Sequence, residues 1–265
     1  MSALARPFAF LGRNTVEAIA GIGYAAMLLV ESLFYTFAGW RRGQPVRIAA
    51  VAAQMRRIGV DALPIVTLLA LTIGLMLGIQ FIAALGEFGA ESQVVIAVAK
   101  SVTREFGALI TAILVAGRSG SALAARIGSM TVSQEVDALA VIGVDPVRYL
   151  VAPALLAMLV MMPVLTIFAD AVAILGAALY CAPALDVTPF AYIAQTLDLV
   201  DPADIGQGLA KSVVFAILIT LIGVSTGFSV SGGAEGVGRA TTRAVVLSIC
   251  WIIVADMLFS FFLNR

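Results

Sequence analysis

The 265-residue sequence has no histidine, only two cysteines and few charged side chains. Without an imidazole group the chain cannot build a His-ligated metal site, a Ser–His dyad or an imidazole proton relay. Cys181 and Cys250 lie within or at the end of apolar segments, without the spacing of metal ligands, and they imply no disulfide. We therefore expect no catalytic residue and no metal site in this chain.

Nucleotide-binding and protease motifs are missing as well. The glycine-rich segment 232–238, which reads as a turn, resembles a phosphate cradle, but the chain contains no GxxxxGK[ST] sequence. Residues 117–120 match the GxSG of an intramembrane serine protease, yet no histidine can supply the base. The net charge is zero, so no basic surface indicates nucleic acid. We expect neither ATP nor another cofactor on this chain, and no nucleic-acid partner.

Hydrophobic residues dominate what is present. They make up 62% of the chain against 12% charged residues, and the mean hydropathy is +1.07. In soluble domains, charged residues alone approach about a quarter. The composition predicts an all-α polytopic membrane protein.

Five apolar runs are long enough to cross a hydrocarbon core of ~30 Å. They cover residues 63–85, 93–117, 149–181, 208–230 and 244–263. At ~1.5 Å per residue the third exceeds the bilayer thickness, so part of it must project, tilt or break at a proline. GxxxG sequences in the first and fourth runs favour close helix contact, although such matches also arise by chance in apolar sequence.

The chain is expected to form one transmembrane domain over residues 1–265, with N-terminal helices at 14–60 ahead of a five-helix core at 61–265. Segment 14–40 is expected to lie in the membrane interface or dip into it, because polar and charged residues interrupt or close it: Glu17, Glu31, Trp40, Arg41 and Arg42. A true span is the alternative. A short amphipathic helix on the cytoplasmic surface follows, carrying Arg47, Arg56 and Arg57.

Arginine placement sets the predicted orientation, because short basic loops stay on the cytoplasmic side. Arginines precede the first span and occupy alternate connections: Arg41, Arg42, Arg47, Arg56, Arg57, Arg118, Arg126, Arg148, Arg239 and Arg243. The opposite connection 182–206 contains four aspartates and neither Lys nor Arg, and it is expected to be an external loop with one short helix. Only Arg265 is then external. The N-terminus is therefore predicted to be cytoplasmic and the C-terminus to lie on the opposite side.

Six charged residues remain inside the predicted spans: Lys100, Arg104, Glu105, Asp170, Lys211 and Asp256. A lone charge near the bilayer centre costs at least ~2.5–3.5 kcal/mol, so such residues normally pair or face protein or water. All six lie in the outer half or near the middle, which predicts a polar cavity or ion-pair cluster that opens outward. Glu105 shares a helical face with small residues and should point into protein. The sequence leaves open whether these charges serve a substrate or only hold helices together.

The polar segment after the second span has helix signals of its own. Residues 131–134 match a capping box, Gly143 suits a left-handed C-terminal cap, and Asp145 before Pro146 suits the start of the next helix. These signals predict a short helix over 132–142. Its exposed acids alternate with apolar residues: Glu135 and Asp137 against Val136, Leu139 and Val141. Such a helix either meets a soluble partner or is an interfacial anchor.

Several segments together resemble the MlaE (YrbE-like) permease family, the membrane subunits of ABC transporters that move lipids between the inner membrane and a periplasmic MCE-domain protein. The resemblance runs from about Arg41 to the end and is strongest at 104–107, 115–118, 135–139, 143–148 and 236–242. The family often has proline where this chain has Ala108. A basic residue is not expected at Lys100, which leaves open whether Lys100 serves a different lipid.

The resemblance implies roles for particular residues and partners. Glu105, Lys211 and Asp256 correspond to the family's intramembrane charged positions. A homodimer in the bacterial inner membrane is implied, with a lipid pocket at its outward-facing centre and with ATP and Mg²⁺ on a separate ATPase. The coupling helix that docks on this ATPase would be the one with Glu135, Val136, Asp137, Ala138 and Leu139.

Two other classes of function fit parts of the sequence. An ion-coupled secondary transporter of a hydrophobic substrate would use the intramembrane carboxylates, but it usually has more spans and detectable inverted repeats. A membrane scaffold would need no cluster of buried charge. The sequence fixes neither the lipid species nor the transport direction.

The arginine distribution generates a topological prediction. A reporter fused after Arg265 should be periplasmic, and one inserted near Ala140 should be cytoplasmic. Alkaline phosphatase and fluorescent-protein fusions measure the two sides, and the opposite result at either site would overturn the orientation.

Overall fold

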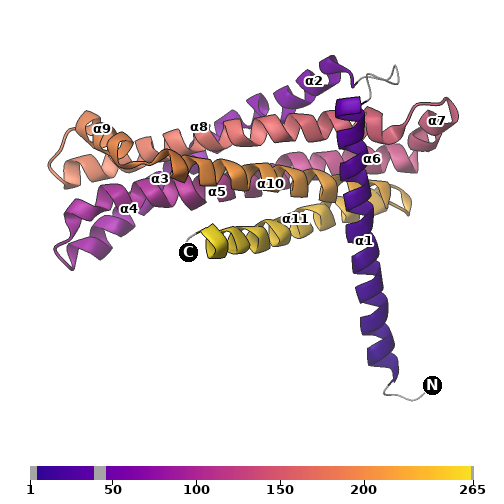
Figure 1. Cartoon of the computed structure of the whole chain (residues 1–265), viewed down its shortest axis with the longest axis horizontal. Coiled ribbons are helices and arrows are strands. Elements are labelled where there is room, and N and C mark those ends of the chain that lie inside the picture. The colour runs from indigo at the N-terminus through magenta and orange to yellow at the C-terminus, as the bar shows by residue number, and fades with distance from the viewer. Residues whose placement is uncertain (1–4, 39–45, 264–265) are drawn as a thin grey trace.

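The computed structural model describes the backbone of residues 5–38 and 46–263 and the side chains of residues 19–36 and 46–263. Within these ranges every regular element is a helix (Figure 1), which confirms the all-α fold. Some residues on which predictions rest lie outside the described side chains, and the structure does not test those predictions: Glu17, Trp40, Arg41, Arg42 and Arg265.

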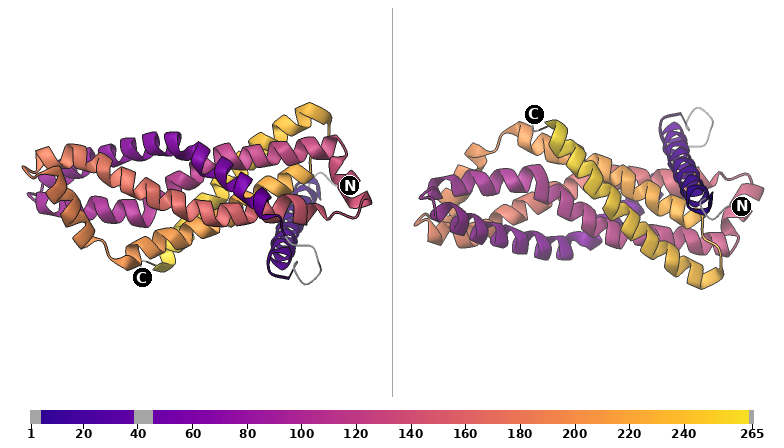
Figure 2. Two further views of the ribbon diagram at one scale, coloured as in Figure 1. Left: turned by 90° about the horizontal axis from the view of Figure 1, so that it is seen from above. Right: turned by 90° about the horizontal axis from the view of Figure 1, so that it is seen from below.

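Five long helical segments run along the long axis of the molecule and confirm the five predicted spans (Figures 1 and 2). They are α3 (Leu63–Gly86), a composite helix over Glu91–Val132, a segment over Val147–Ala184 that contains α8 (Ala152–Ala184), α10 (Pro202–Phe228) and α11 (Gly233–Leu263). α7 (Glu135–Val141) lies at one end of this bundle and α9 (Pro189–Leu199) at the other. We call these the α7 end and the α9 end.

The composite helix is longer than predicted. It contains α4 (Val94–Ser101), α5 (Gly107–Val115) and α6 (Ser121–Val132), joined by π-helical turns at Val102–Phe106 and Ala116–Gly120. The predicted end at Gly117 is therefore wrong, because the second π turn carries the helix through the glycines and serines there. At ~1.5 Å per residue its 42 residues measure about 63 Å, so α6 projects beyond a ~30 Å core at the α7 end.

One further boundary prediction is corrected, and an alternative left open for another is excluded. The segment 232–238 is mostly not a turn, because α11 begins at Gly233 and only Gly232 and Gly233 have left-handed φ values, 89° and 70°. Of the three alternatives for the third apolar run, a break at a proline is excluded, because Pro163 lies inside the continuous α8, and projection or tilt remain.

The short helix near the α7 end also begins later than predicted. Thr131 is not an N-cap, because α6 runs through it and its hydroxyl donates to the Ile127 carbonyl at 2.9 Å. The break comes at Gln134, whose φ is 58°. The other two signals are confirmed: Gly143 has φ 77°, and the Asp145 carboxylate accepts from the backbone N–H of Val147 at 2.8 Å.

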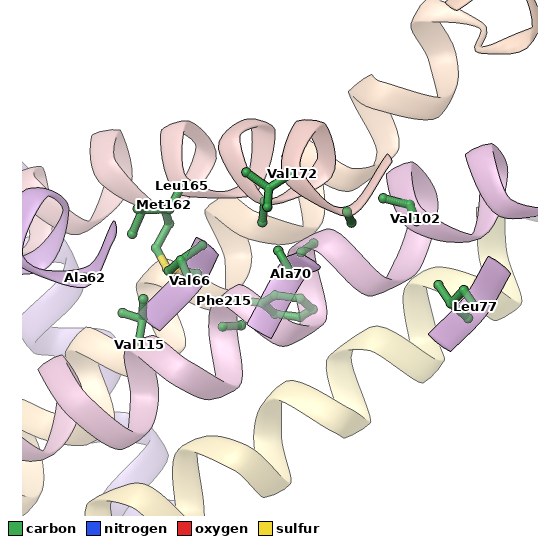
Figure 3. Packing of buried hydrophobic residues seen from close by; sticks show 14 of the residues in the cluster. Ala62, Val66, Ala70, Leu77, Val102, Val115, Met162, Leu165, Val172 and Phe215 are labelled. Atoms are coloured by element: carbon green, nitrogen blue, oxygen red, sulfur yellow. The ribbon is translucent and has the colours of Figure 1, made fainter. Parts of the chain in front are cut away.

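Small residues let the long helices approach one another closely. A Cβ on Gly74 would lie 1.8 Å from the Ala173 carbonyl oxygen, and one on Gly208 would lie 2.3 Å from the Thr103 oxygen. Both GxxxG sequences therefore lie at helix contacts, since a Cβ on Gly227 would come within 2.8 Å of Ile127. Figure 3 shows part of the resulting core, with buried side chains from α3, α8 and α10, among them Val66, Leu165 and Phe215.

The N-terminal helices flank the five long segments, and each adds a buried residue to the core clusters, Leu28 from α1 and Ile58 from α2. α1 (Ala5–Ala38) crosses the bundle steeply near the α7 end (Figures 1 and 2), as expected of a helix along the membrane surface, although it is also long and apolar enough for a span. The Tyr35 hydroxyl donates to Asp145 at 2.8 Å and ties α1 to the segment after α7. The predicted amphipathic helix is confirmed as α2 (Ile48–Ile58), which packs against α8.

Candidate functional site

Lys211 stands at the centre of the intramembrane charges. Its side chain is 0% exposed, and its Nζ donates to Glu105 Oε2 at 2.5 Å and to Ser260 Oγ at 3.2 Å. Nζ also forms an ion pair with Asp256 Oδ1 at 2.9 Å, although the angles at this contact do not suit a hydrogen bond. The Ser260 hydroxyl in turn donates to Glu105 Oε1 at 2.8 Å. We call Lys211, Glu105, Asp256 and Ser260 the Lys211 cluster.

Helix periodicity explains why these side chains meet. Asp256 and Ser260 are one turn apart on α11, and they continue a packed stripe at four-residue spacing through Ala244, Ser248 and Ile252. Lys211 lies on the buried face of α10, and Glu105 projects from the π turn at Val102–Phe106. Single-turn π segments are often associated with functional sites.

A second ion pair lies beside the cluster. Arg104, the neighbour of Glu105, reaches Asp204 through Nε and Nη2, both 2.5 Å from Oδ1. Asp204 is almost fully buried and also caps the start of α10, where its Oδ2 accepts from the Asp201 backbone N–H at 3.3 Å. The pair therefore fixes the composite helix against the first turn of α10.

The remaining two predicted charges are not brought into the cluster. Asp170 is buried on α8, and its Oδ1 has no hydrogen-bond partner among the described residues. It lies against Gly107, where an added Cβ would be 1.6 Å from Oδ1. Lys100 has no carboxylate within 4.0 Å in the described part of the chain. Of the six predicted charges, three therefore lie in the Lys211 cluster, one pairs with a residue outside the set, and two have no charged partner among the described residues: Lys211, Glu105 and Asp256; Arg104; and Asp170 and Lys100.

Sequence reasoning missed Ser260 and Asp204. Ser260 had one usable signal, its position one turn after Asp256 on the same helix face. Asp204 was assigned to an external loop, although the sequence Asp201-Pro202 before it is a helix-start signal.

The Lys211 cluster and the adjoining Arg104–Asp204 pair are open on one side. The Glu105 side chain is 30% exposed and that of Arg104 is 34% exposed, while Lys211 is closed off completely. One ammonium group faces two carboxyl groups here. The arrangement therefore combines a rigid buried cation with charged groups that reach the surface of the single chain.

The predicted coupling residues lie elsewhere, at the α7 end. α7 has no buried residue, and Glu135 and Asp137 are both exposed in its first turn. Val141 and Ile142 beside them are 87% and 71% exposed. A short helix that presents acids and apolar side chains together has the composition of a protein-docking surface.

An apolar cavity of about 980 Å³ lies between α1, α10 and α11. Its lining is mostly aliphatic, with Arg243 toward one end and Trp251 toward the other. Ligand pockets of this size are common and mostly apolar. The cavity adjoins the same α10 and α11 that carry Lys211 and Asp256.

Comparisons with known proteins agree with this arrangement. A family model described as Permease MlaE matches residues 51–262, which include the whole Lys211 cluster and α7. A probable ABC transporter permease protein of Rickettsia prowazekii (strain Madrid E) is 36% identical over 214 residues, 81% of this chain and 83% of that protein. Protein TRIGALACTOSYLDIACYLGLYCEROL 1, chloroplastic, of Arabidopsis thaliana is 35% identical over 79% of this chain and 60% of that protein.

Some relatives match over almost the full length of both chains. The intermembrane phospholipid transport system permease protein MlaE of Haemophilus influenzae is 33% identical over 252 residues, which cover 94% of each chain. With six helices among the described residues long and apolar enough to cross a membrane, a cluster of buried charge and this degree of identity, the chain belongs to the MlaE permease family.

Proposed function

We propose that this protein is the permease subunit of an ABC transporter that moves phospholipids between the inner membrane and a periplasmic MCE-domain protein. The observation that carries the proposal is the Lys211 cluster, a buried cation with two carboxyl groups at membrane depth. The relatives' names, an ABC transporter permease and an intermembrane phospholipid transport permease, support it. ATP hydrolysis then takes place on a separate ATPase chain that holds ATP and Mg²⁺.

The exposed side of the cluster suits a phospholipid headgroup. Lys211 lies nine residues into α10, about 14 Å from the helix start at the α9 end. Charges at that depth are costly next to lipid tails. Arg104 has five N–H donors, of which Nε and Nη2 engage Asp204, so others are available to a phosphate oxygen. The partly exposed carboxylate of Glu105 is complementary to an ammonium headgroup.

The orientation proposed for this pathway follows the arginines. The α7 end carries the arginine-rich connections and is assigned to the cytoplasm, and the α9 end is assigned to the periplasm. The Lys211 cluster then lies in the outer half of the membrane, as a pathway toward a periplasmic acceptor requires. An ion-coupled secondary transporter is the weaker alternative, because the family comparison favours ABC permeases.

α7 is the proposed contact with the ATPase. It lies at the cytoplasmic end in this orientation, exposes Glu135 and Asp137, and presents Val141 and Ile142 without cover from the rest of the chain. The hydrogen bond from Tyr35 to Asp145 links α1 to the segment that follows α7. ATPase docking would therefore act on both α6 and α1.

A homodimer is proposed through α11. In the most apolar stretch of α11, only 11% of the residues are buried within the chain, against 56% in the corresponding stretch of α10. A second copy packed on the outward face of α11 would cover this surface and enclose the open side of the Lys211 cluster in a central cavity. In a two-fold interface the same surface patch of both subunits meets, so each residue lies near the same residue of the second copy or near one of its neighbours.

The dimer proposal predicts cross-linking along α11. In a Cys250→Ser background, which keeps only the buried Cys181, one cysteine introduced at Val246, Val254 or Met257 should give a covalent dimer in membranes with a short bismaleimide, because at least one of these positions lies close to the two-fold axis. Native Cys250, also exposed, is a further position on this helix. Leu175→Cys on the exposed face of α8 is the matched control. Cross-linking at Leu175 alone, or at no α11 position, would contradict the assigned interface.

The ATPase contact predicts a charge-reversal phenotype. Glu135→Lys with Asp137→Lys should reduce co-purified ATPase at least tenfold, because reversed charges face the partner, while the permease stays inserted. Glu87→Lys with Asp198→Lys makes the same charge change at exposed positions of the α9 end and should leave ATPase binding intact. Normal binding and ATPase stimulation by the α7 variant would reduce this helix to an interfacial anchor.

The proposed pathway predicts that stability and transport separate within the cluster. Glu105→Gln should leave the fold nearly unchanged, because Lys211 keeps Asp256 at 2.9 Å and Ser260 at 3.2 Å. Lys211→Gln should destabilise by ~3–5 kcal/mol, because it leaves two carboxyl groups without their cation. Glu105→Gln should nevertheless lower ATP-dependent lipid transfer at least tenfold.

The measurements are thermal unfolding in detergent and transfer of labelled phospholipid from proteoliposomes that contain the ATPase. Asp256→Asn is the companion variant, since it removes the other carboxylate of Lys211. If stability and transfer fall in parallel for all three variants, the cluster only holds the helices together and the pathway role is lost.

A further inference from the structure

A second concentration of charge lies at the α7 end, and it is almost entirely positive. Two adjoining cavities, of about 340 and 270 Å³, share Gln54, Arg57 and Arg126 in their walls. Together they are lined by five guanidinium groups and a single carboxylate: Arg47, Arg57, Arg118, Arg126, Arg148 and Asp61. We call this site the arginine pocket.

The positive charge of the arginine pocket is not balanced by the described part of the chain. Asp61 lies 4.0 Å from Arg118, at the outer limit of an ion pair. Among the described residues, no carboxylate lies within 4.0 Å of the other four guanidinium groups. The Nη1 of Arg118 is buried and has no hydrogen-bond partner there. Guanidinium groups gathered in this way call for an external anion with several acceptor oxygens.

The pocket lies at the depth of lipid headgroups. Asp61 is the last charged residue before α3, and residues 63–86 contain none, so Asp61 marks the edge of the hydrocarbon core. Arg118 pairs with Asp61 and is therefore at the same level. Beside this level, Ile65 and Leu68 of α3 are exposed apolar side chains that suit acyl chains.

The walls of the pocket also suit a lipid more than a small ion. The first cavity includes Leu123 and Met158, and the second includes Leu150 and the partly exposed Tyr149. Apolar and aromatic side chains next to arginines match the glycerol and phosphate parts of a phospholipid. Inorganic phosphate shares only the anionic part of that chemistry.

We propose that the arginine pocket binds the phosphate group of an anionic phospholipid from the leaflet at the α7 end. This site is separate from the Lys211 cluster and does not depend on the proposed transport function. Its arginines come from three segments: α2 and the residue before it, the composite helix from the π turn Ala116–Gly120 into α6, and the π turn Val147–Val151. One bound phosphate would hold these segments together on both sides of α7.

The test uses the purified full chain in neutral detergent and dioctanoyl phosphatidylglycerol as the probe. Wild-type protein should bind the probe saturably, measured by native mass spectrometry and by a rise in the thermal midpoint. Arg57→Gln and Arg126→Gln should each weaken binding about tenfold or more, because each removes charge-assisted hydrogen bonds. Arg56→Gln is the matched control, since Arg56 is the exposed neighbour of Arg57 on α2 and lines neither cavity.

Parallel titrations with dioctanoyl phosphatidylcholine and inorganic phosphate separate the sources of the anion. Weak binding of both, with tight binding of the anionic lipid, supports the proposal. Equal weakening by Arg56→Gln would mean diffuse surface charge, and equally tight inorganic phosphate would mean a free-anion site; either overturns it. Arg57→Gln that binds the lipid normally but loses the ATPase would assign the pocket to a protein contact instead. If Arg57→Gln does not fold, Arg148→Gln gives the same comparison from the opposite wall.

Discussion

The burial of Lys211 constrains the rest of the bundle. An ammonium group with no exposed surface is tolerable only while a carboxylate stays in reach, and Lys211 has two, Glu105 and Asp256, with Ser260 as a further acceptor. A buried charge left without any partner typically costs ~3–5 kcal/mol. These partners come from two other helices. A shift of one residue along α11 would rotate Asp256 by about 100° away from Lys211. The rotation and register of three helices are therefore fixed together by one side chain.

The π turn at Val102–Phe106 explains how one segment serves two sites on α10. Arg104 pairs with Asp204 and Glu105 with Lys211, so adjacent residues engage partners seven positions apart, two turns along the same face of α10. The close approach that this requires is possible because Gly208 lies between the two partners and presents no Cβ to the Thr103 carbonyl. A local irregularity in one helix and a glycine in the next thus form a single contact.

The positions of the helices could be predicted from the sequence better than the contacts between their charged side chains. Runs of apolar residues gave the spans, and local signals at Gly143 and Asp145 gave the end of one helix and the start of another, because both depend on neighbours within a few residues. The grouping of charges in the membrane also followed from their cost. Which of these charges meet could not be predicted, because the contacts depend on helix rotation and packing, which leave Asp170 and Lys100 outside the Lys211 cluster. The π turns were not foreseen, because no residue pattern in 102–106 or 116–120 distinguishes them from α-helix, and the predicted end at Gly117 failed for that reason.

The two ends of the molecule are linked through the same helices that surround Lys211. Beyond Glu105 the composite helix continues to Val132, close to the start of α7. It contacts α10 tightly on the way, where a Cβ on Gly223 would lie 3.0 Å from the Gly120 carbonyl oxygen. Between the cluster and α7 lies the π turn Ala116–Gly120, where the backbone hydrogen-bond pattern changes. Independent rotation of any one helix would leave a buried charge unpaired. A rearrangement that keeps Lys211 satisfied must therefore move these helices as a unit or bend the composite helix at this turn.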